Sequence, residues 1–228
     1  MLRMDLVQNN YEDFEIPEGF IVFISGVPGV GKTTISYELL KRCNSFRIIE
    51  ETDLIREVLR GYNFFLGESF PTQSNDILRQ IRITDHTKLL SLDEAKQQCE
   101  IMRYSFEYIV ARQQRKGIPS IINGVHIVPE ILNGIVDNHN VIFINLYIHS
   151  ADALYKRLIN RNPKSYMVNH VPFIFKTNQE LYTSTMRISK ELPYIFHNVD
   201  VTESSIDETL CKIMGLIRKA VEYTKTFF

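Results

Sequence analysis

The sequence predicts an α/β fold with a five-stranded, mostly parallel sheet and helices on both faces. Short apolar runs alternate with longer segments of helical periodicity, which is typical of βαβ units around a parallel sheet. The apolar runs are mostly non-alternating, as strands covered on both faces should be. The 228 residues are 44% hydrophobic and contain no internal repeat. We therefore expect one domain over residues 1–228.

Five apolar runs are candidate strands. Each is short and rich in Ile, Val and Phe. They are Phe20–Ser25, Phe46–Glu50, Ser120–Asn123, Val141–Ile148 and Ile195–Val199.

Two of the intervening helices show a stripe of apolar residues that step by three and four. One stripe runs over residues 92–109 and the other over 206–221. Both stripes are expected to pack in the core. Ser204 or Ser205 precedes the second stripe and is a candidate N-cap.

Composition excludes several functional classes. The formal net charge of −1 gives no global field for nucleic acid or an anionic membrane. The three cysteines are far apart and lack metal-ligand spacing, as in a reduced cytosolic protein. No signal peptide is visible, and no apolar run approaches the roughly 20 residues of a membrane span. We expect a soluble, cytoplasmic protein, and a homodimer stays open.

The first candidate strand runs directly into a glycine-rich loop that opens a helix. The loop satisfies the pattern G-x-x-x-x-G-K-[ST] in its required strand–loop–helix context. Its residues are Gly26, Val27, Pro28, Gly29, Val30, Gly31, Lys32, Thr33 and Thr34. The sequence therefore predicts a P-loop NTPase domain that binds the phosphates of ATP, or of GTP, with Mg²⁺.

Physical reasons assign roles within this loop. Glycines let backbone N–H groups surround phosphate oxygens, and the helix N-terminus adds partial positive charge. Lys32 is expected to contact the β- and γ-phosphates during phosphoryl transfer, and the Thr33 hydroxyl to ligate Mg²⁺.

Carboxylates and an arginine follow the second candidate strand, at the sheet edge where ligands bind in open α/β folds. Asp53 is suited to accept a proton from a substrate hydroxyl, and Arg56 to hold a substrate anion. Glu51 could position Mg²⁺ through water. The alternative interpretation makes Asp53 an N-cap and Arg56 a solvated helix residue.

Two arginines follow the fourth candidate strand. Arg157 and Arg161 stand four apart, on one helical face. Placed before a proline-interrupted stretch, they suit a helical lid over about 160–192 that closes on the transferring phosphoryl group. The alternative is a pair of solvated helix arginines.

The third candidate strand ends in Asn123 rather than in an acidic residue. Asn123 can accept or donate a hydrogen bond near Mg²⁺ but carries no charge. Its presence weakens the hypothesis of a motor-type ATPase, whose water activation depends on a carboxylate there. A kinase that draws its base from Asp53 needs that carboxylate less.

Three segments together resemble the 2-phosphoglycerate kinase family. They are Ser25–Thr34, Thr52–Arg60 and Asn123–Pro129. The chain also looks like the wider group of small P-loop kinases that includes zeta toxins and shikimate kinases. The resemblance implies that Asp53 and Arg56 face the acceptor, with Arg60 and His126 among the substrate-binding residues. The chain departs from the family at Asn123, where an acidic residue is usual. As an alternative to substrate contact, His126 could equally cap the helix near Pro129.

The leading hypothesis is an ATP-dependent kinase that phosphorylates a hydroxyl of a small anionic metabolite. A kinase of a nucleotide sugar or of an RNA-linked amino acid is an alternative, although the near-neutral charge argues against large RNA. A nucleotide-dependent switch with little turnover is the rival from another class. Exposed aromatics could then form an interface, or they could line an acceptor pocket; they are Tyr62, Phe64, Phe65 and Phe70.

Overall fold

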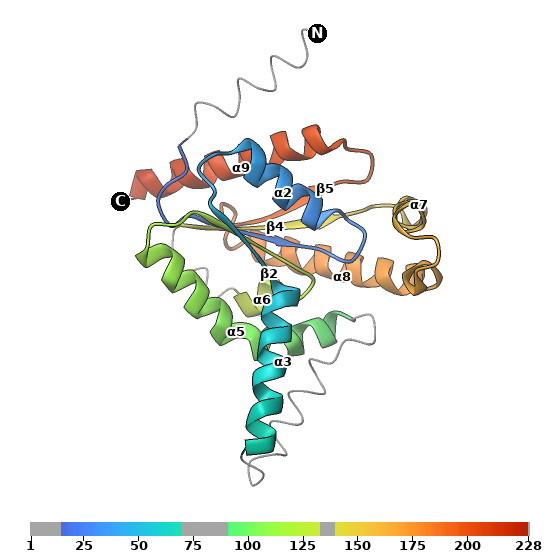
Figure 1. Ribbon diagram of the computed structural model, residues 1–228. Coiled ribbons are helices and arrows are strands. Elements are labelled where there is room, and N and C mark those ends of the chain that lie inside the picture. Colours follow the sequence, from blue (N-terminus) through green and yellow to red (C-terminus); the bar gives the residue numbers. More distant parts are fainter. Residues whose placement is uncertain (1–14, 70–90, 133–139, 228) are drawn as a thin grey trace.

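A parallel β-sheet forms the centre of the molecule. The computed structural model describes residues 15–69, 91–132 and 140–227 (Figure 1). Within these residues, five strands lie in the order β2-β3-β1-β4-β5, and each pair is parallel. The strands are β1 (Ile21–Ser25), β2 (Ile48–Glu51), β3 (Ser120–Asn123), β4 (Val141–Tyr147) and β5 (Phe196–Asp200). The predicted strands are confirmed, with ends that differ by at most two residues.

The central strand β1 is hydrogen-bonded on both sides, with Ile21 opposite Ser120 of β3 and Val141 of β4. All five of its residues are buried. Because both faces of β1 are covered, its sequence is a continuous apolar run rather than an alternating one. The loop that follows β1 therefore starts from a buried strand that is hydrogen-bonded along both edges.

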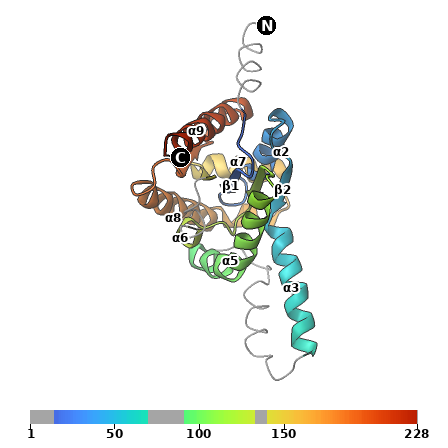
Figure 2. The same cartoon turned by 90° about the vertical axis from the view of Figure 1, so that its left-hand side faces the viewer.

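Helices cover both faces of the sheet (Figures 1 and 2). The helices α2 (Lys32–Arg42) and α9 (Ile206–Phe227) contribute to the core on one face. On the other face lie α5 (Leu92–Arg115), α6 (Pro129–Leu132) and much of α8 (Val171–Ser189). The apolar stripes predicted over 92–109 and 206–221 lie on the buried sides of α5 and α9, except that Ile206 at the start of α9 is exposed.

Serine and glutamate side chains fix the starts of these two long helices. Ser91 and Glu94 form a capping box at α5. At α9, the Ser205 hydroxyl accepts from the Glu208 N–H, and the Glu208 carboxylate accepts from the Ser205 N–H. This reciprocal pairing satisfies two otherwise unpaired donors. Of the two predicted N-cap candidates, Ser205 is the one used.

The segment predicted as a lid belongs largely to the sheet layers. After α7 (Ala151–Arg161) and a 3₁₀ turn at Tyr166–His170, the chain forms α8, which packs along β4 and β5. Asn178 is buried and exchanges two hydrogen bonds with the backbone of Ile148, at 2.8 and 3.2 Å. Most of the predicted lid, 160–192, is therefore a helix that packs on the sheet, and its movement stays a prediction. The short segment 162–170 stays a candidate lid.

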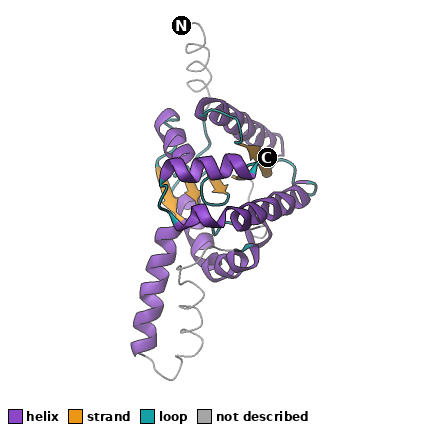
Figure 3. Cartoon of the chain, turned by 90° about the vertical axis from the view of Figure 1, so that its right-hand side faces the viewer, coloured by secondary structure: helices purple, strands orange, loops and turns teal. Residues whose placement is uncertain are grey.

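Helix α3 (Thr52–Ser69) projects away from the sheet (Figures 1 and 3). It starts directly at the end of β2, so Asp53 lies in its first turn rather than at an N-cap. Tyr62, Phe64 and Phe65 are each more than half exposed on it; Phe70 lies outside the described residues. Across the described ranges, no helix is long and apolar enough to span a membrane.

Candidate active site

The glycine-rich loop has backbone geometry that only glycine tolerates at its first position. Gly26 has φ of 139°, and a Cβ there would come within 2.5 Å of the Leu146 carbonyl oxygen on β4. Gly31 has φ of 97° and is the N-cap of α2. These conformations turn the chain sharply from β1 into α2, so that the N-terminus of α2 faces the enclosed loop.

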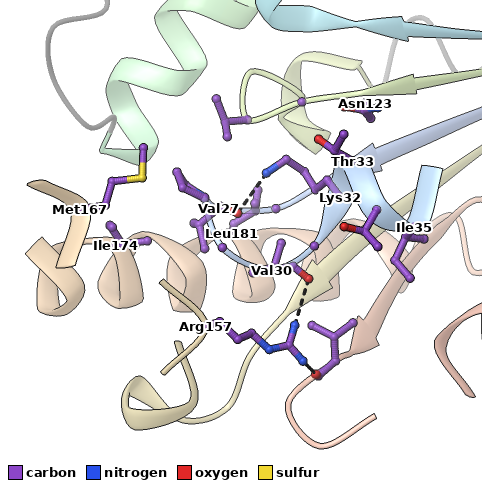
Figure 4. A pocket seen from close by; sticks show the side chains of 18 of the residues that line it. Val27, Val30, Lys32, Thr33, Ile35, Asn123, Arg157, Met167, Ile174 and Leu181 are labelled. Carbon is purple, nitrogen blue, oxygen red and sulfur yellow. Dashed lines mark hydrogen bonds between the residues drawn. The ribbon is translucent and has the colours of Figure 1, made fainter. Parts of the chain in front are cut away.

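Lys32 reaches back over this loop. Its Nζ donates to the Val27 carbonyl oxygen at 3.0 Å (Figure 4), and its side chain is 9% exposed. Burial lowers the pKa of Lys32 to about 8, an effect that nearby Asp53 opposes and nearby Arg161 reinforces. A buried ammonium held by one carbonyl is poorly solvated. Phosphate oxygens would be better partners.

A cavity of about 910 Å³ opens above the loop. Its volume lies within the range of ligand pockets. Residues from the ends of β1, β2, β3 and β5 and from helices α2, α7, α8 and α9 line it. The cavity thus lies outside the carboxyl ends of the parallel strands, where ligands bind in open α/β sheets. All nine predicted loop residues, Gly26 through Thr34, line it.

One end of the cavity lies between the glycine-rich loop and the segment after β5. Arg157 joins the two: it donates to the Val30 carbonyl at 3.3 Å and to the Val201 carbonyl (Figure 4). Burial lowers the pKa of Arg157. The segment after β5 is also held by Asp200, which accepts from the N–H and hydroxyl of Thr202 at 2.8 and 2.6 Å. Val201 and Ser204 of this segment line the cavity.

The other end holds the polar residues that were predicted to act on the phosphates and the acceptor. Glu51, Asp53 and Asn123 line the cavity from the ends of β2 and β3. Asn123 is 3% exposed, and its Nδ2 has no hydrogen-bond partner in the structure. A buried donor without a partner is costly, so a ligand oxygen or a water is expected there. Thr33 lines the same space.

The two predicted lid arginines have different surroundings. Arg157 is engaged with backbone carbonyls, whereas Arg161 is exposed at the end of α7 and lines the cavity near Lys32. Both arginines line the cavity, and Arg157 bonds there to the glycine-rich loop and to the segment after β5. Their joint action on a phosphoryl group stays a prediction.

Three predicted substrate-binding residues do not line the cavity: Arg56, Arg60 and His126. Arg56 is 8% exposed and His126 is fully buried beneath the first turn of α3. Arg60 lies one turn further along α3, 3.6 Å from the Glu57 carboxylate. Sequence spacing placed Arg56 on the same helix as Asp53 but could not show which side of that helix faces the ligand.

An apolar wall of the cavity was missed. Met167, Ile174 and Leu181 form part of this wall (Figure 4). Ile174, Thr177 and Leu181 step by three and four along α8, so one stripe of that helix faces the cavity. The periodicity was visible in the sequence, whereas the surface that it covers depends on how α8 packs. Tyr62, Phe64 and Phe65, considered as a pocket wall, do not line the cavity.

Comparisons with known proteins agree with this geometry. The 2-phosphoglycerate kinase of Pyrococcus horikoshii is 28% identical over 217 residues, which cover 90% of this chain. That of Methanococcus maripaludis strain C7 is 31% identical over 210 residues, which cover 86% of it. The chain resembles the 2-phosphoglycerate kinases. No family model matches it.

The chain spans just under two thirds of these 2-phosphoglycerate kinases, 66% of the first and 64% of the second. A gluconokinase from Sinorhizobium meliloti 1021 shares the fold, with a TM-score of 0.50 and 12% identity over 94% of this chain and 97% of that one. The two proteins therefore share a fold over most of both chains.

The donor set at the polar end fits a magnesium ion. Among the described residues, no group of three His, Cys, Asp or Glu side chains forms a metal site. A hydroxyl, a carboxylate and an amide are present instead, in Thr33, Glu51 and Asn123. Mg²⁺ usually keeps several waters and takes one or two protein oxygens plus substrate phosphates. A site with only a few oxygen ligands from the protein is therefore sufficient for Mg²⁺.

Proposed function

We propose that the protein is an ATP-dependent kinase. In this proposal it transfers the γ-phosphoryl group to a hydroxyl of a small anionic metabolite, of the 2-phosphoglycerate kind. The observation that carries the proposal is the placement of Asp53 and Lys32 in one cavity, close enough for Asp53 to affect the pKa of Lys32. A phosphate-binding lysine and a carboxylate then act on opposite sides of one transferring group.

The residues support the following sequence of events. Backbone N–H groups of the glycine-rich loop and Lys32 hold the β- and γ-phosphates. Asp53 accepts the proton of the acceptor hydroxyl, whose oxygen then bonds to the γ-phosphorus. The bond from that phosphorus to the bridging oxygen breaks, and ADP leaves with the electron pair. Arg161 is positioned to stabilise the charge on the transferring group.

Thr33 and Glu51 would hold Mg²⁺, with Asn123 bonding to one of its waters or to a phosphate oxygen. When bound, the ion neutralises charge on the β- and γ-phosphate oxygens. Glu51 brings the formal negative charge of this set. We therefore expect the protein residues alone to bind Mg²⁺ weakly, and the ion to bind together with the nucleotide.

The nucleotide base is assigned to the end of the cavity between Arg157 and Val201–Ser204. A planar guanidinium that caps this end can stack on a base. The surrounding Ile206 and Thr209 give a partly apolar wall. No described residue decides between adenine and guanine, so both nucleotides belong in the test.

Two observations support an anionic acceptor. The relatives are named 2-phosphoglycerate kinases, and they align over most of this chain. At the acceptor side, Arg161 supplies a positive charge besides Lys32. A guanidinium binds carboxylates and phosphates in a bidentate manner.

The decisive experiment measures magnesium-dependent ADP release with ATP or GTP against a panel of hydroxyl acceptors. The panel contains 2-phosphoglycerate, 3-phosphoglycerate, glycerate, shikimate, gluconate, nucleotide sugars and seryl-tRNA. Lys32→Ala is the blank. We expect strong stimulation by a small anionic acceptor and a 10²–10⁴-fold loss in Asp53→Asn. Stimulation by a nucleotide sugar or by the tRNA alone would replace the proposed acceptor class, and an undiminished Asp53→Asn would remove Asp53 as the base.

A nucleotide-dependent switch is the second candidate. It is favoured by the exposed aromatic surface of α3, formed by Tyr62, Phe64 and Phe65, which lies outside the cavity. An exposed apolar patch of this kind is typical of an interaction surface. Tight ATP binding without turnover on any acceptor, and a partner bound only in the ATP state, would establish the switch and exclude the kinase.

A further inference from the structure

A buried polar network lies directly beneath Asp53. His126 is fully buried, and burial, together with the charges of Arg56 and Lys32, lowers its pKa to about 3. The ring is therefore neutral at any physiological pH. A neutral imidazole has one donor and one acceptor nitrogen, so the groups beside each nitrogen decide its tautomer.

The neighbours of His126 settle which nitrogen carries the proton. Arg56 Nη1 lies 3.4 Å from Nε2 of His126. A guanidinium has only donors, so Nε2 must be the acceptor. The proton is then on Nδ1, which donates to the Thr52 hydroxyl oxygen at 2.8 Å. His126 thus bonds to the first residue of α3 with one nitrogen and to the side chain of Arg56 with the other.

Arg56 transmits this contact to the carboxylate in the cavity. Its Nη1 also lies 3.3 Å from Oδ1 of Asp53, and its Nε and Nη2 donate to Glu57 at 3.1 and 2.7 Å. The Arg56 side chain is 10% exposed, whereas that of Asp53 is 66% exposed. Asp53 would otherwise be free to change rotamer. A buried guanidinium, held from behind by His126, restricts it.

The network also joins two strand ends. A Cβ on Gly124 would overlap the Thr52 hydroxyl, so the chain leaving β3 packs directly on the start of α3. Asn123 lies on one side of this contact and Asp53 on the other, and both line the cavity. Thr52, which is fully buried, is the common partner of Gly124 and His126.

We propose that His126 is a positioning residue, which as the neutral Nδ1–H tautomer holds Thr52 and Arg56 so that the Asp53 carboxylate faces the acceptor hydroxyl. This inference rests on the proposed kinase function and replaces the expectation that His126 contacts substrate. His126 touches neither nucleotide nor acceptor. Its effect on turnover passes entirely through Asp53.

The tautomer can be tested without any acceptor. Protein with ¹⁵N-labelled histidine is examined by long-range ¹H–¹⁵N correlation, and His126 is assigned by the signals that disappear in His126→Asn. We expect the Nδ1–H tautomer and no titration between pH 5 and 8. An Nε2–H tautomer, or a ring that titrates near its ordinary pKa, would overturn the proposal whether or not the protein is a kinase.

The positioning role is tested by a double-mutant cycle on the acceptor that the panel identifies. His126→Asn is expected to lower kcat about 10- to 100-fold, because small displacements of a reacting group are costly. The KM for that acceptor and the Kd for a magnesium–AMPPNP complex should change less than about twofold. In the Asp53→Asn background, His126→Asn should have no further effect on kcat.

Each alternative role gives a different result in this cycle. A substrate contact would raise the acceptor KM, and a purely structural role would lower kcat equally in both backgrounds. Either result contradicts the proposal. Thr52→Val, which removes the hydroxyl at constant shape, should reproduce the effect of His126→Asn, and Thr183→Ala, an exposed threonine on α8, is the matched control.

Discussion

At the residue scale, the surroundings of Lys32 disfavour its charged form. Its ammonium group is buried and donates a hydrogen bond to a loop carbonyl, that of Val27. The pKa of Lys32 falls from 10.5 to about 8 because burial disfavours its charged form. Lys32, which the proposed reaction needs, therefore lowers the stability of the protein when no nucleotide is bound.

Lys32→Met should stabilise the protein in the absence of nucleotide. The lowered pKa corresponds to a cost of roughly 3 kcal/mol below pH 8, and loss of the Val27 bond offsets part of it, so we expect a gain of about 1–3 kcal/mol. Because the unfolded state binds the proton more tightly, the gain is full below about pH 8 and shrinks as the pH rises toward 10.5. Urea denaturation at pH 7 and pH 10 measures both values. An equal gain at the two pH values would show that desolvation of the charge is not its source.

Replacement of Arg157 and replacement of Arg161 are expected to change different kinetic parameters. Arg161→Ala should lower kcat by about 10²–10³-fold with little change in nucleotide affinity, since it acts on the transferring group. Arg157→Ala should mainly raise the KM for nucleotide, because it releases the segment after β5 from the glycine-rich loop. Steady-state kinetics separates the two, with the exposed Lys156→Ala on the same helix as control. Identical profiles for both variants would restore the lid pair inferred from their spacing.

Local motifs could be predicted at this scale, and buried contacts could not. Lys32 and Thr33 could be assigned to the predicted site because the loop is a contiguous pattern, and both line the cavity. Arg56 was placed correctly on the helix of Asp53, but its burial depends on His126, which is 70 residues distant in sequence. No periodicity within α3 reveals that partner.

At the scale of elements, α8 is attached to the sheet by a contact that could not be predicted from its sequence. Asn178 uses its amide to pair both backbone groups of Ile148, at the end of β4. The helix is thereby attached to the strand whose continuation carries Arg157. The sequence placed this segment in the predicted lid, and nothing in it showed that Asn178 and Thr185 would be buried. They are buried because their partners are backbone groups of the sheet and of α8 itself.

Asn178→Ala should destabilise the fold by about 2–4 kcal/mol. It leaves two buried backbone groups of Ile148 without these partners and creates a small cavity. Thr183→Ala, on the exposed side of the same helix, is expected to change stability by less than about 0.5 kcal/mol. Chemical denaturation of both variants provides the comparison. If Asn178→Ala altered turnover but left stability intact, α8 would be a moving lid after all.

The strands were the most predictable elements. The interior strands β1 and β3 are fully buried, and glycine follows each of them, so composition marked where they end. The projecting helix α3 was less predictable, because its exposed side carries Leu54, Val58 and Tyr62. A helix is usually predicted from an apolar stripe on its buried side, and the exposed apolar residues of α3 obscure that pattern.

At the scale of the whole molecule, the cavity touches nearly every layer of the fold. Strand ends, the glycine-rich loop and helices from both halves of the sequence meet there. A bound nucleotide would therefore connect parts of the chain that otherwise meet only through the sheet. Local openings of any of these parts would have to break contacts with it.

Magnesium–ATP at 100 times its Kd should raise the free energy of unfolding by about 2.7 kcal/mol. For a domain of this size, such a gain corresponds to an increase in Tm of roughly 5–10 °C. Thermal denaturation followed by circular dichroism measures it, with Lys32→Ala as the variant expected to lose the shift. A shift that persisted in Lys32→Ala would mean that the nucleotide binds away from the glycine-rich loop.

The central position of β1 has a consequence for how the chain reaches this structure. β1 precedes the other described strands in the sequence, yet its partners on β3 and β4 lie about 100 and 120 residues further along. Contacts between such distant segments require costly loop closures, so folding should be slow for a protein of this length. Until β4 has emerged from the ribosome, the apolar strand Ile21–Ser25 has no complete place in a sheet. The strand that carries the glycine-rich loop is thus unprotected against aggregation during this part of synthesis, when a chaperone could shield it.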